Sequence, residues 1–272
     1  MNRALVLAAC AASIAACAAG QDNKVTVPLS SPSQPATLKV HLITGTITVM
    51  PGTSGQIVID SEGGRGRNAR RDDRNAPPGM HRIDIGPHGF NAVEDHNVVT
   101  ISPDIGGFNG INLAIQVPVN TSVELGTVNG GRVEVGGING DIDVQNVNAP
   151  ILITGVSGAV SANTTNGSVT VALDRVTPDK PMSFSSLNGK IDVTLPGDTK
   201  AKMRLKTTNG AVYSDFDVKI EPDTTKPVIE DSRGHGGKYR IVMERSVVGS
   251  INGGGPEYSF HTFNGDILIH KK

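Results

Sequence analysis

The stretch Thr164-Thr165-Asn166-Gly167-Ser168-Val169-Thr170-Val171 carries the pattern that decides the fold. An Asn-Gly pair is followed by a short run in which every second residue is apolar. The chain repeats this order in Ser186-Leu187-Asn188-Gly189-Lys190-Ile191-Asp192-Val193 and again after Thr207-Thr208-Asn209-Gly210, at steps of 22 and 21 residues. Because side chains alternate between the two faces of a strand, each run predicts a strand with one buried face.

Asn-Gly pairs mark the predicted corners along the whole second half of the chain. They are Asn129-Gly130, Asn139-Gly140, Asn166-Gly167, Asn188-Gly189, Asn209-Gly210 and Asn264-Gly265. Ser157-Gly158 falls on the same spacing, and Asn148-Ala149 is a degenerate member of the series. Glycine allows the positive φ that we expect at such a corner, and asparagine tolerates the left-handed region better than most residues.

Two architectures can produce this series. Asn-Gly between alternating runs is a strong hairpin signal, which predicts an antiparallel meander. A fixed period near twenty residues instead favours coils that stack in parallel. We therefore expect an all-β fold, a parallel β-solenoid with rungs of about 20–22 residues, in which equivalent asparagines form an amide ladder. Asn166, Asn188 and Asn209 are then expected in one column.

Residues 1–20 resemble a secretory signal peptide, with a basic start and an apolar run too short for a bilayer core of roughly 30 Å. Ile14-Ala15-Ala16-Cys17 resembles the lipobox of bacterial lipoproteins, which predicts lipidation of Cys17 as the mature N-terminus. The alternative is ordinary cleavage after Gly20. Because Ala18 rather than Asp follows the cysteine, we expect an exported protein, lipid-anchored at the outer membrane and facing the periplasm or the exterior.

The remaining chain divides into a tether and one domain. Residues 21–35 are rich in Ser and Pro and predict a flexible tether. Residues 36–272 are expected to form the solenoid, with mobile loops at about 61–80 and 220–238 where apolar residues are sparse. Tyr258 and Phe260 are expected to cover the open end of the last coil, since an exposed edge invites pairing with another chain.

The first of these loops is rich in arginine. Its five arginines are Arg65, Arg67, Arg70, Arg71 and Arg74. One interpretation is a site for an anionic partner, such as lipid A phosphates or acidic glycans. The other is an ordinary solvated loop, because Asp72 and Asp73 lie among the arginines.

Composition excludes several classes of protein. The 25 Lys and Arg residues balance 26 Asp and Glu residues, which argues against a nucleic-acid partner. The two cysteines, Cys10 and Cys17, both lie in the leader, so the folded part has no disulfide and no cysteine metal site. The histidines do not follow a metal-ligand spacing. We therefore expect no cofactor and no bound metal.

Catalysis is also not indicated. The outward carboxylates of the predicted strands are Glu134, Asp141, Asp143 and Asp192. A glycosidase needs two carboxyl groups at a defined separation, and stacked rungs bring acidic residues together on any wet face. No Ser-His-Asp elbow, P-loop or zinc signature occurs. Gly136-Gly137-Ile138-Asn139-Gly140-Asp141 is similar to the repeats of calcium-binding solenoids, but its spacing differs by one residue.

The repeated motifs resemble a bacterial family of adhesin-like β-strand repeat proteins known as DUF4097. The resemblance rests on Glu-Leu-Gly-Thr-Val-Asn-Gly, Ile-Asn-Gly-Asp-Ile-Asp-Val, Thr-Thr-Asn-Gly-Ser-Val-Thr-Val and Phe-Asn-Gly-Asp-Ile-Leu-Ile, and covers roughly Ala36 to the C-terminus. It implies a fold similar to parallel β-helices and an exported or membrane-attached protein. It brings no catalytic residues.

Together these features predict a non-catalytic binding or adhesion-like module of the cell envelope. The expected partner is an envelope protein or a glycan, with the membrane reached through the lipid anchor. The alternative is a structural envelope protein that associates with itself. A polysaccharide-active β-helix enzyme is the third hypothesis.

Overall fold

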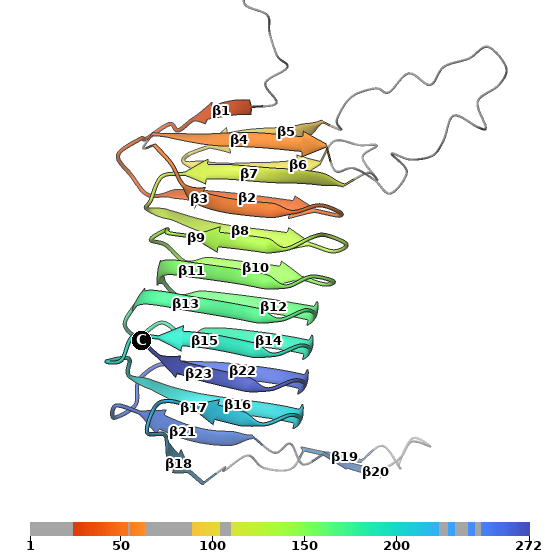
Figure 1. The fold of residues 1–272 in the computed structure, drawn as a ribbon, viewed down its shortest axis with the longest axis vertical. Helices are drawn as coiled ribbons and strands as arrows, with labels where there is room; N and C mark the ends of the chain where they lie inside the picture. Colours follow the sequence, from red (N-terminus) through yellow and green to blue (C-terminus); the bar gives the residue numbers. More distant parts are fainter. Residues whose placement is uncertain are drawn as a thin grey trace, which may run out of the picture.

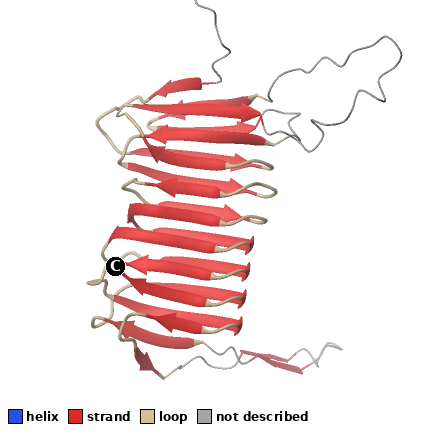
Figure 2. Cartoon of the chain, in the orientation of Figure 1, coloured by secondary structure: helices blue, strands red, loops and turns tan. Residues whose placement is uncertain are grey.

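The computed structural model describes residues 24–53, 55–63, 89–103, 110–222, 228–231, 239–242 and 246–272. Within these ranges every regular element is a β-strand, and the strands form sheets of ten, eleven and two strands. Figures 1 and 2 show the two large sheets as one tall stack. The predicted all-β class is confirmed.

The two large sheets are called sheet A and sheet B, and each is described by its strands in spatial order. Sheet A contains β1 (Lys24–Pro28), β4 (Gln56–Gly63), β7 (Ile111–Val117), β3 (Ile47–Pro51), β9 (Val133–Gly136), β11 (Ile151–Gly158), β13 (Val169–Val176), β15 (Ile191–Leu195), β23 (Ile267–Lys271) and β17 (Val212–Ser214). Sheet B contains β18 (Lys219–Glu221), β21 (Val247–Ile251), β16 (Ala201–Asn209), β22 (Glu257–Asn264), β14 (Met182–Asn188), β12 (Val160–Asn166), β10 (Ile142–Asn146), β8 (Thr121–Thr127), β2 (Ala36–Leu42), β6 (Val98–Pro103) and β5 (Phe90–Asp95).

From β6 to β17 the chain alternates between the sheets, and throughout the stack a sheet B strand with the sheet A strand that follows it is called a rung. The rungs are β2–β3, β6–β7, β8–β9, β10–β11, β12–β13, β14–β15, β16–β17 and β22–β23. Neighbouring rungs pair in parallel in both sheets. The parallel pairing excludes the hairpin meander for this part of the chain.

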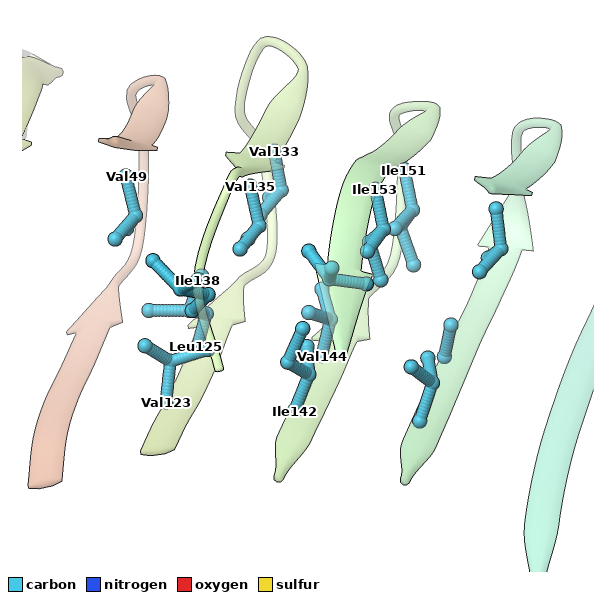
Figure 3. Close-up of a cluster of buried hydrophobic side chains, with 14 of the residues drawn as sticks. Val49, Val123, Leu125, Val133, Val135, Ile138, Ile142, Val144, Ile151 and Ile153 are labelled. Carbon is cyan, nitrogen blue, oxygen red and sulfur yellow. The ribbon is translucent and has the colours of Figure 1, made fainter. Parts of the chain in front are cut away.

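Alternating apolar residues fill the space between the sheets. In β10, Ile142 and Val144 are buried, whereas Asp143 between them is half-buried on the outer face. Figure 3 shows the same arrangement along several rungs, with the side chains of β8 and β10 directed toward those of β9 and β11. The predicted register of the buried face is therefore right.

The predicted parallel solenoid is confirmed in part, because the sheets are mixed. Antiparallel strands extend the stack at both ends: β4 and β5 at one end, β21 and β18 at the other. The rung length also varies more than expected. The asparagines that start successive corners are separated by 19, 18 and 22 residues, so the predicted 20–22 holds only for the last of these steps.

Two rungs lie out of chain order. The β2–β3 rung lies between β6–β7 and β8–β9, and the β22–β23 rung lies between β14–β15 and β16–β17. Asn166, Asn188 and Asn209 do share one column, but Asn264 separates Asn188 from Asn209. The period of 21 residues predicts Asn188 and Asn209 on adjacent rungs, and that prediction is wrong.

The prediction for the end cover was also wrong. Tyr258 and Phe260 belong to the inserted rung and are 1% and 0% exposed. The Phe260 ring stacks on Phe184 of β14, with centroids 5.0 Å apart. Burial away from water raises the pKa of the Tyr258 hydroxyl. The aromatic side chain buried after β17, the last strand of sheet A, is Phe216.

The structure differs from the expected tether and loops. Lys24–Pro28 forms β1, which pairs antiparallel with β4, so this part of the expected tether belongs to the fold. The segment 220–238 contains part of β18 and the strand β19 (Val228–Asp231), which pairs with β20 (Tyr239–Val242) in the two-stranded sheet. Residues 64–80 of the other predicted loop lie outside the described residues, and so does the leader with Cys17.

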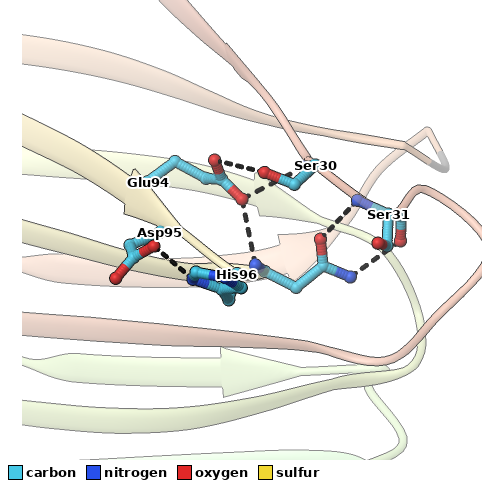
Figure 4. Close-up of polar contacts among 6 residues, drawn as sticks. Ser30, Ser31, Glu94, Asp95 and His96 are labelled. Carbon is cyan, nitrogen blue, oxygen red and sulfur yellow. Dashed lines mark hydrogen bonds and ion pairs between the residues drawn. The ribbon is translucent and has the colours of Figure 1, made fainter.

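Four residues beside β1 are joined by hydrogen bonds and are called the clasp: Ser30, Ser31, Glu94 and Asn97. Figure 4 labels the first three of them. The backbone N and the hydroxyl of Ser30 donate to the Glu94 carboxylate at 3.1 and 2.9 Å. Asn97 Oδ1 accepts from the Ser31 backbone N at 2.7 Å, and its Nδ2 donates to the Ser31 carbonyl at 2.7 Å. The backbone N–H groups of Ser30 and then Asn97 lower the pKa of Glu94.

Candidate binding surface

Asparagine side chains form a continuous ladder along the corner where the chain passes from sheet B to sheet A. Each Nδ2 donates to the Oδ1 of the neighbouring rung: Asn148 to Asn129 at 2.8 Å, Asn166 to Asn148 at 2.9 Å, Asn188 to Asn166 at 2.8 Å, Asn264 to Asn188 at 2.7 Å and Asn209 to Asn264 at 2.8 Å. All of the donors point the same way along the stack. The predicted amide ladder is confirmed, and Asn148 is a full member of it.

Glycine follows the ladder asparagine for a different reason from the one expected. Gly130, Gly167, Gly189 and Gly210 do not have positive φ; of the ladder pairs, Gly265 alone does, with φ 154°. A Cβ at Gly189 would lie 2.0 Å from the Gly167 carbonyl oxygen, and one at Gly210 would lie 2.0 Å from that of Gly265. At these two glycines the neighbouring rung approaches so closely that a side chain cannot be accommodated, whereas the equivalent position of the β10–β11 rung holds Ala149.

A second polar column lies inside the ladder, two residues before each asparagine. In four rungs its hydroxyl donates to a corner carbonyl of the neighbouring rung: Thr164 to Ala149 at 3.1 Å, Ser186 to Gly167 at 2.8 Å, Thr262 to Gly189 at 3.0 Å and Thr207 to Gly265 at 3.0 Å. The other two positions hold Asn146, whose amide donates to the Ala149 carbonyl at 3.0 Å, and Thr127, whose buried hydroxyl has no hydrogen-bond partner among the described residues. The sequence analysis missed these residues. The Thr or Ser at a fixed distance before Asn-Gly was the available signal.

The residue between the hydroxyl and the asparagine points outward and is often apolar. Val128, Leu187 and Phe263 are 44%, 49% and 44% exposed. Ile43 lies at the same register after β2, between Leu42 and Thr44, and is 52% exposed. The same position holds Val147, Thr165 and Thr208 in the other rungs. These residues and the Asn ladder together are called the corner surface: Ile43, Val128, Val147, Thr165, Leu187, Phe263 and Thr208, with Asn129, Asn148, Asn166, Asn188, Asn264 and Asn209.

The pair Asn139-Gly140 lies elsewhere. It stands at the opposite corner, where the chain returns from β9 to β10, and Asn139 bridges in parallel to Ser157. Ser157-Gly158 lies at the next turn of that corner, as the last two residues of β11 before β12 begins at Val160. The predicted series of turns thus divides between two corners. The steps from Asn129 to Asn139 and from Asn139 to Asn148, of ten and nine residues, lead from one corner to the other.

Charged residues gather on the outer face of sheet B. Lys39 Nζ lies 2.7 Å from Glu124 Oε2, and Lys180 Nζ lies 2.6 Å from Asp141 Oδ2. Lys39 lowers the pKa of Glu124. An open depression of about 350 Å³ lies between these pairs, and Asp143 lines it. Among the described residues, the buried Asp143 Oδ1 has no hydrogen-bond partner.

The outward carboxylates considered for catalysis divide between the two sheets. Glu134 is on β9 in sheet A and Asp143 is on β10 in sheet B, so stacking does not bring them together. Asp192, on β15 of sheet A, is paired with Lys190 at 3.0 Å. In the described part of the chain no group of three or more His, Cys, Asp or Glu side chains could hold a metal ion.

Several predicted residues cannot be placed. Cys17 and the five arginines at positions 65, 67, 70, 71 and 74 lie outside the described residues. The part of the chain that the structure describes contains no helix with the length and apolar character needed to cross a membrane.

Comparisons with known proteins add one structural neighbour. No family model and no curated protein matches the chain. A crystal structure from Clostridium sporogenes, described as a "putative cell adhesion protein", is similar over 92% of this chain and 99% of that chain, with 10% identity and a TM-score of 0.44. The resemblance to the DUF4097 family is not confirmed by a family model and stays a hypothesis.

Proposed function

We propose that the chain is a β-solenoid that acts as a non-catalytic binding module of the cell envelope and engages an extended glycan through the corner surface. The observation that carries the proposal is one unbroken row of exposed amides, flanked by exposed apolar side chains, across rungs that lie far apart in sequence. The resemblance to adhesin-like repeat proteins agrees with this function.

The chemistry of the ladder favours a hydroxyl-rich partner. An asparagine amide has two donor hydrogens and an acceptor oxygen with two lone pairs. A ladder bond uses one donor of one residue and one lone pair of the next, so interior members such as Asn166 and Asn188 keep one of each. Neighbouring rungs repeat these groups about every 4.8 Å.

The apolar members of the corner surface contribute the second part of the recognition. Leu187 and Phe263 stand on adjacent rungs, since β14 pairs with β22. Their exposed side chains offer a surface on which the C–H face of a sugar ring can pack. Because a polymer can contact several rungs at once, weak contacts at single rungs add through a high effective concentration.

The test is binding of the mature protein to purified bacterial envelope polysaccharides, with corner variants. Leu187→Ala and Phe263→Ala remove exposed side chains and leave the ladder intact, so we expect weaker binding with unchanged unfolding. Val247→Ala is the matched control, because Val247 is 43% exposed on β21 and lies outside the corner surface. Equal binding by the corner variants and the unsubstituted protein would contradict the proposal.

We also propose export and lipid anchoring through Cys17. The support is the lipobox-like sequence before it. Replacing Cys17 by Ser should leave the protein unprocessed or soluble, which detergent-phase partitioning measures. Unchanged partitioning into the detergent phase would show that Cys17 carries no anchor.

A further inference from the structure

The inserted rung β22–β23 joins two parts of the molecule that do not pair directly. After β15 ends at Leu195 the chain begins β16 at Ala201, yet these consecutive rungs are separated in space. β22 pairs with β14 on one side and with β16 on the other. β23 likewise pairs with β15 and with β17. The strands β16, β17, β18 and β21 therefore connect to the rest of each sheet through this rung.

The inserted rung lies between β14–β15 and β16–β17 and pairs in parallel with both, and the space between these two rungs is called the slot. The buried side chains of the inserted rung match those of its neighbours. Tyr258 stands in register with Met182 on β14 and with Met203 on β16. All three side chains are at most 3% exposed. The stacked rings of Phe184 and Phe260 add a specific contact on the β14 side. Aromatic pairs of this kind contribute beyond their buried area, so the slot fits this rung better than another.

A short glycine-rich connection leads into the rung. Asn252, Gly253 and Gly254 all have positive φ, at 49°, 90° and 83°. A Cβ at Gly253 would meet nothing within 4 Å, so the connection is open on that side. Three glycines and positive-φ backbone allow Asn252-Gly253-Gly254-Gly255-Pro256 to extend with little steric cost. Extension breaks the two hydrogen bonds that the Asn252 amide donates to the Gly197 and Thr199 carbonyls, at 3.1 and 2.7 Å.

The other inserted rung is held differently. β2–β3 is preceded by β1 and followed by β4, which pair with each other. The clasp also ties Ser30 and Ser31, just before β2, to Glu94 and Asn97. Releasing β2–β3 therefore requires breaking contacts on both sides along the chain.

We propose that the slot between β14–β15 and β16–β17 is an interaction surface for a second copy of this chain, which supplies its own β22–β23 rung by exchange. In the exchanged dimer every strand pairing and the Phe184–Phe260 stack are reproduced, and only the connection Asn252-Gly253-Gly254-Gly255-Pro256 changes conformation. Exchange of an identical element is a low-cost route to dimers for this reason.

The experiment mixes two full-length single-cysteine variants, in both of which Cys10 and Cys17 are replaced by Ser. One population carries Ser183→Cys and the other Ser259→Cys, residues in register on β14 and β22. The mixture is taken through the unfolding midpoint at high concentration, returned to native conditions and oxidised. Adjacent parallel strands are spaced within disulfide range, so the S183C/S259C double variant should form its disulfide within one chain and verifies the geometry.

The matched control keeps S183C and pairs it with Ser161→Cys on the other neighbouring strand, β12. We expect a covalent heterodimer, identified by mass labels, from S183C with S259C and only background from S183C with S161C. No heterodimer from the first mixture would overturn the proposal. Equal yields from both mixtures would also overturn it, because they would reflect general strand exchange rather than exchange of this rung.

Discussion

The two ends of the stack each hold one rung out of chain order, but they are closed by different forces. At the first end, β1, β4 and β5 extend both sheets, and the clasp ties the connections with hydrogen bonds to a carboxylate and an amide. At the second end, sheet A stops at the short strand β17, and the inserted rung is held by fully buried aromatic side chains. The first end should therefore respond to pH, and the second to loss of packing.

The largest expected effect is loss of packing at the second end. Phe260→Ala removes a fully buried ring and its stack on Phe184, which should lower the free energy of unfolding by about 3–5 kcal/mol. Phe263→Ala is the matched control three residues later, where the ring is 44% exposed. Denaturant unfolding measures both changes, and similar losses would show that the inserted rung is not held by its core residues.

A smaller effect is expected from crowding at the corner. Gly189→Ala places a methyl group 2.0 Å from the Gly167 carbonyl oxygen, so neighbouring rungs must move apart at a cost of about 1–3 kcal/mol. The control is Ala149→Gly, because Ala149 occupies the equivalent corner position in the β10–β11 rung. That change should cost about 0.5–1 kcal/mol through backbone entropy and about 0.8 kcal/mol more for the buried methyl group, without any clash. An unchanged free energy of unfolding in Gly189→Ala would contradict the close approach.

The loss of stability on replacing a ladder asparagine should depend on its position in the ladder. Asn188 donates one amide bond and accepts another, whereas Asn209, the last member, donates one. At about 0.5–1.5 kcal/mol for each bond, Asn188→Ala should cost up to about twice as much as Asn209→Ala. Thermal or denaturant unfolding of the two variants measures the difference. A larger loss for Asn209→Ala would mean that the ladder does not act as a chain of equal bonds.

The smallest expected effect is a loss of folding stability at low pH, which arises at the first end. Hydrogen bonds in the clasp lower the pKa of Glu94 below the usual value of 4.5, so the carboxylate contributes stability above that value. This contribution is lost as the pH falls through the lowered pKa of the folded state. Thermal unfolding should therefore show a larger acid-induced loss in the unsubstituted protein than in Glu94→Gln. A pH-independent difference between the two proteins would contradict the role of the clasp.

Local patterns in the sequence predict a large part of this structure. Alternation places Ile142 and Val144 in the core, and repeated Asn-Gly pairs predict the ladder. The predicted glycine role was wrong at most ladder corners, because glycine is required there by the close approach of the next rung and not by its own φ. The distance between rungs is set by tertiary packing, so the sequence of a single repeat does not reveal it.

The order of the rungs could not be predicted for a related reason. Thr207-Thr208-Asn209-Gly210 and Thr262-Phe263-Asn264-Gly265 carry nearly the same corner motif, so either can follow Asn188 in the ladder. The difference lies in the interior, where Phe260 stacks on Phe184. A fixed repeat specifies how a rung is built, whereas the contacts between particular side chains specify its neighbour.

The rung order is the central feature of the fold, and disulfide trapping tests it most directly. In separate full-length proteins with Cys10 and Cys17 replaced by Ser, two thiols are introduced at Asn188 and Asn264, or at Asn188 and Asn209. Register neighbours on parallel strands lie within the usual Cα separation of about 4.4–6.8 Å, while the second pair is two rungs apart. We expect rapid intramolecular crosslinking of N188C/N264C and little of N188C/N209C; crosslinking of N188C/N209C in preference would contradict the inserted rung.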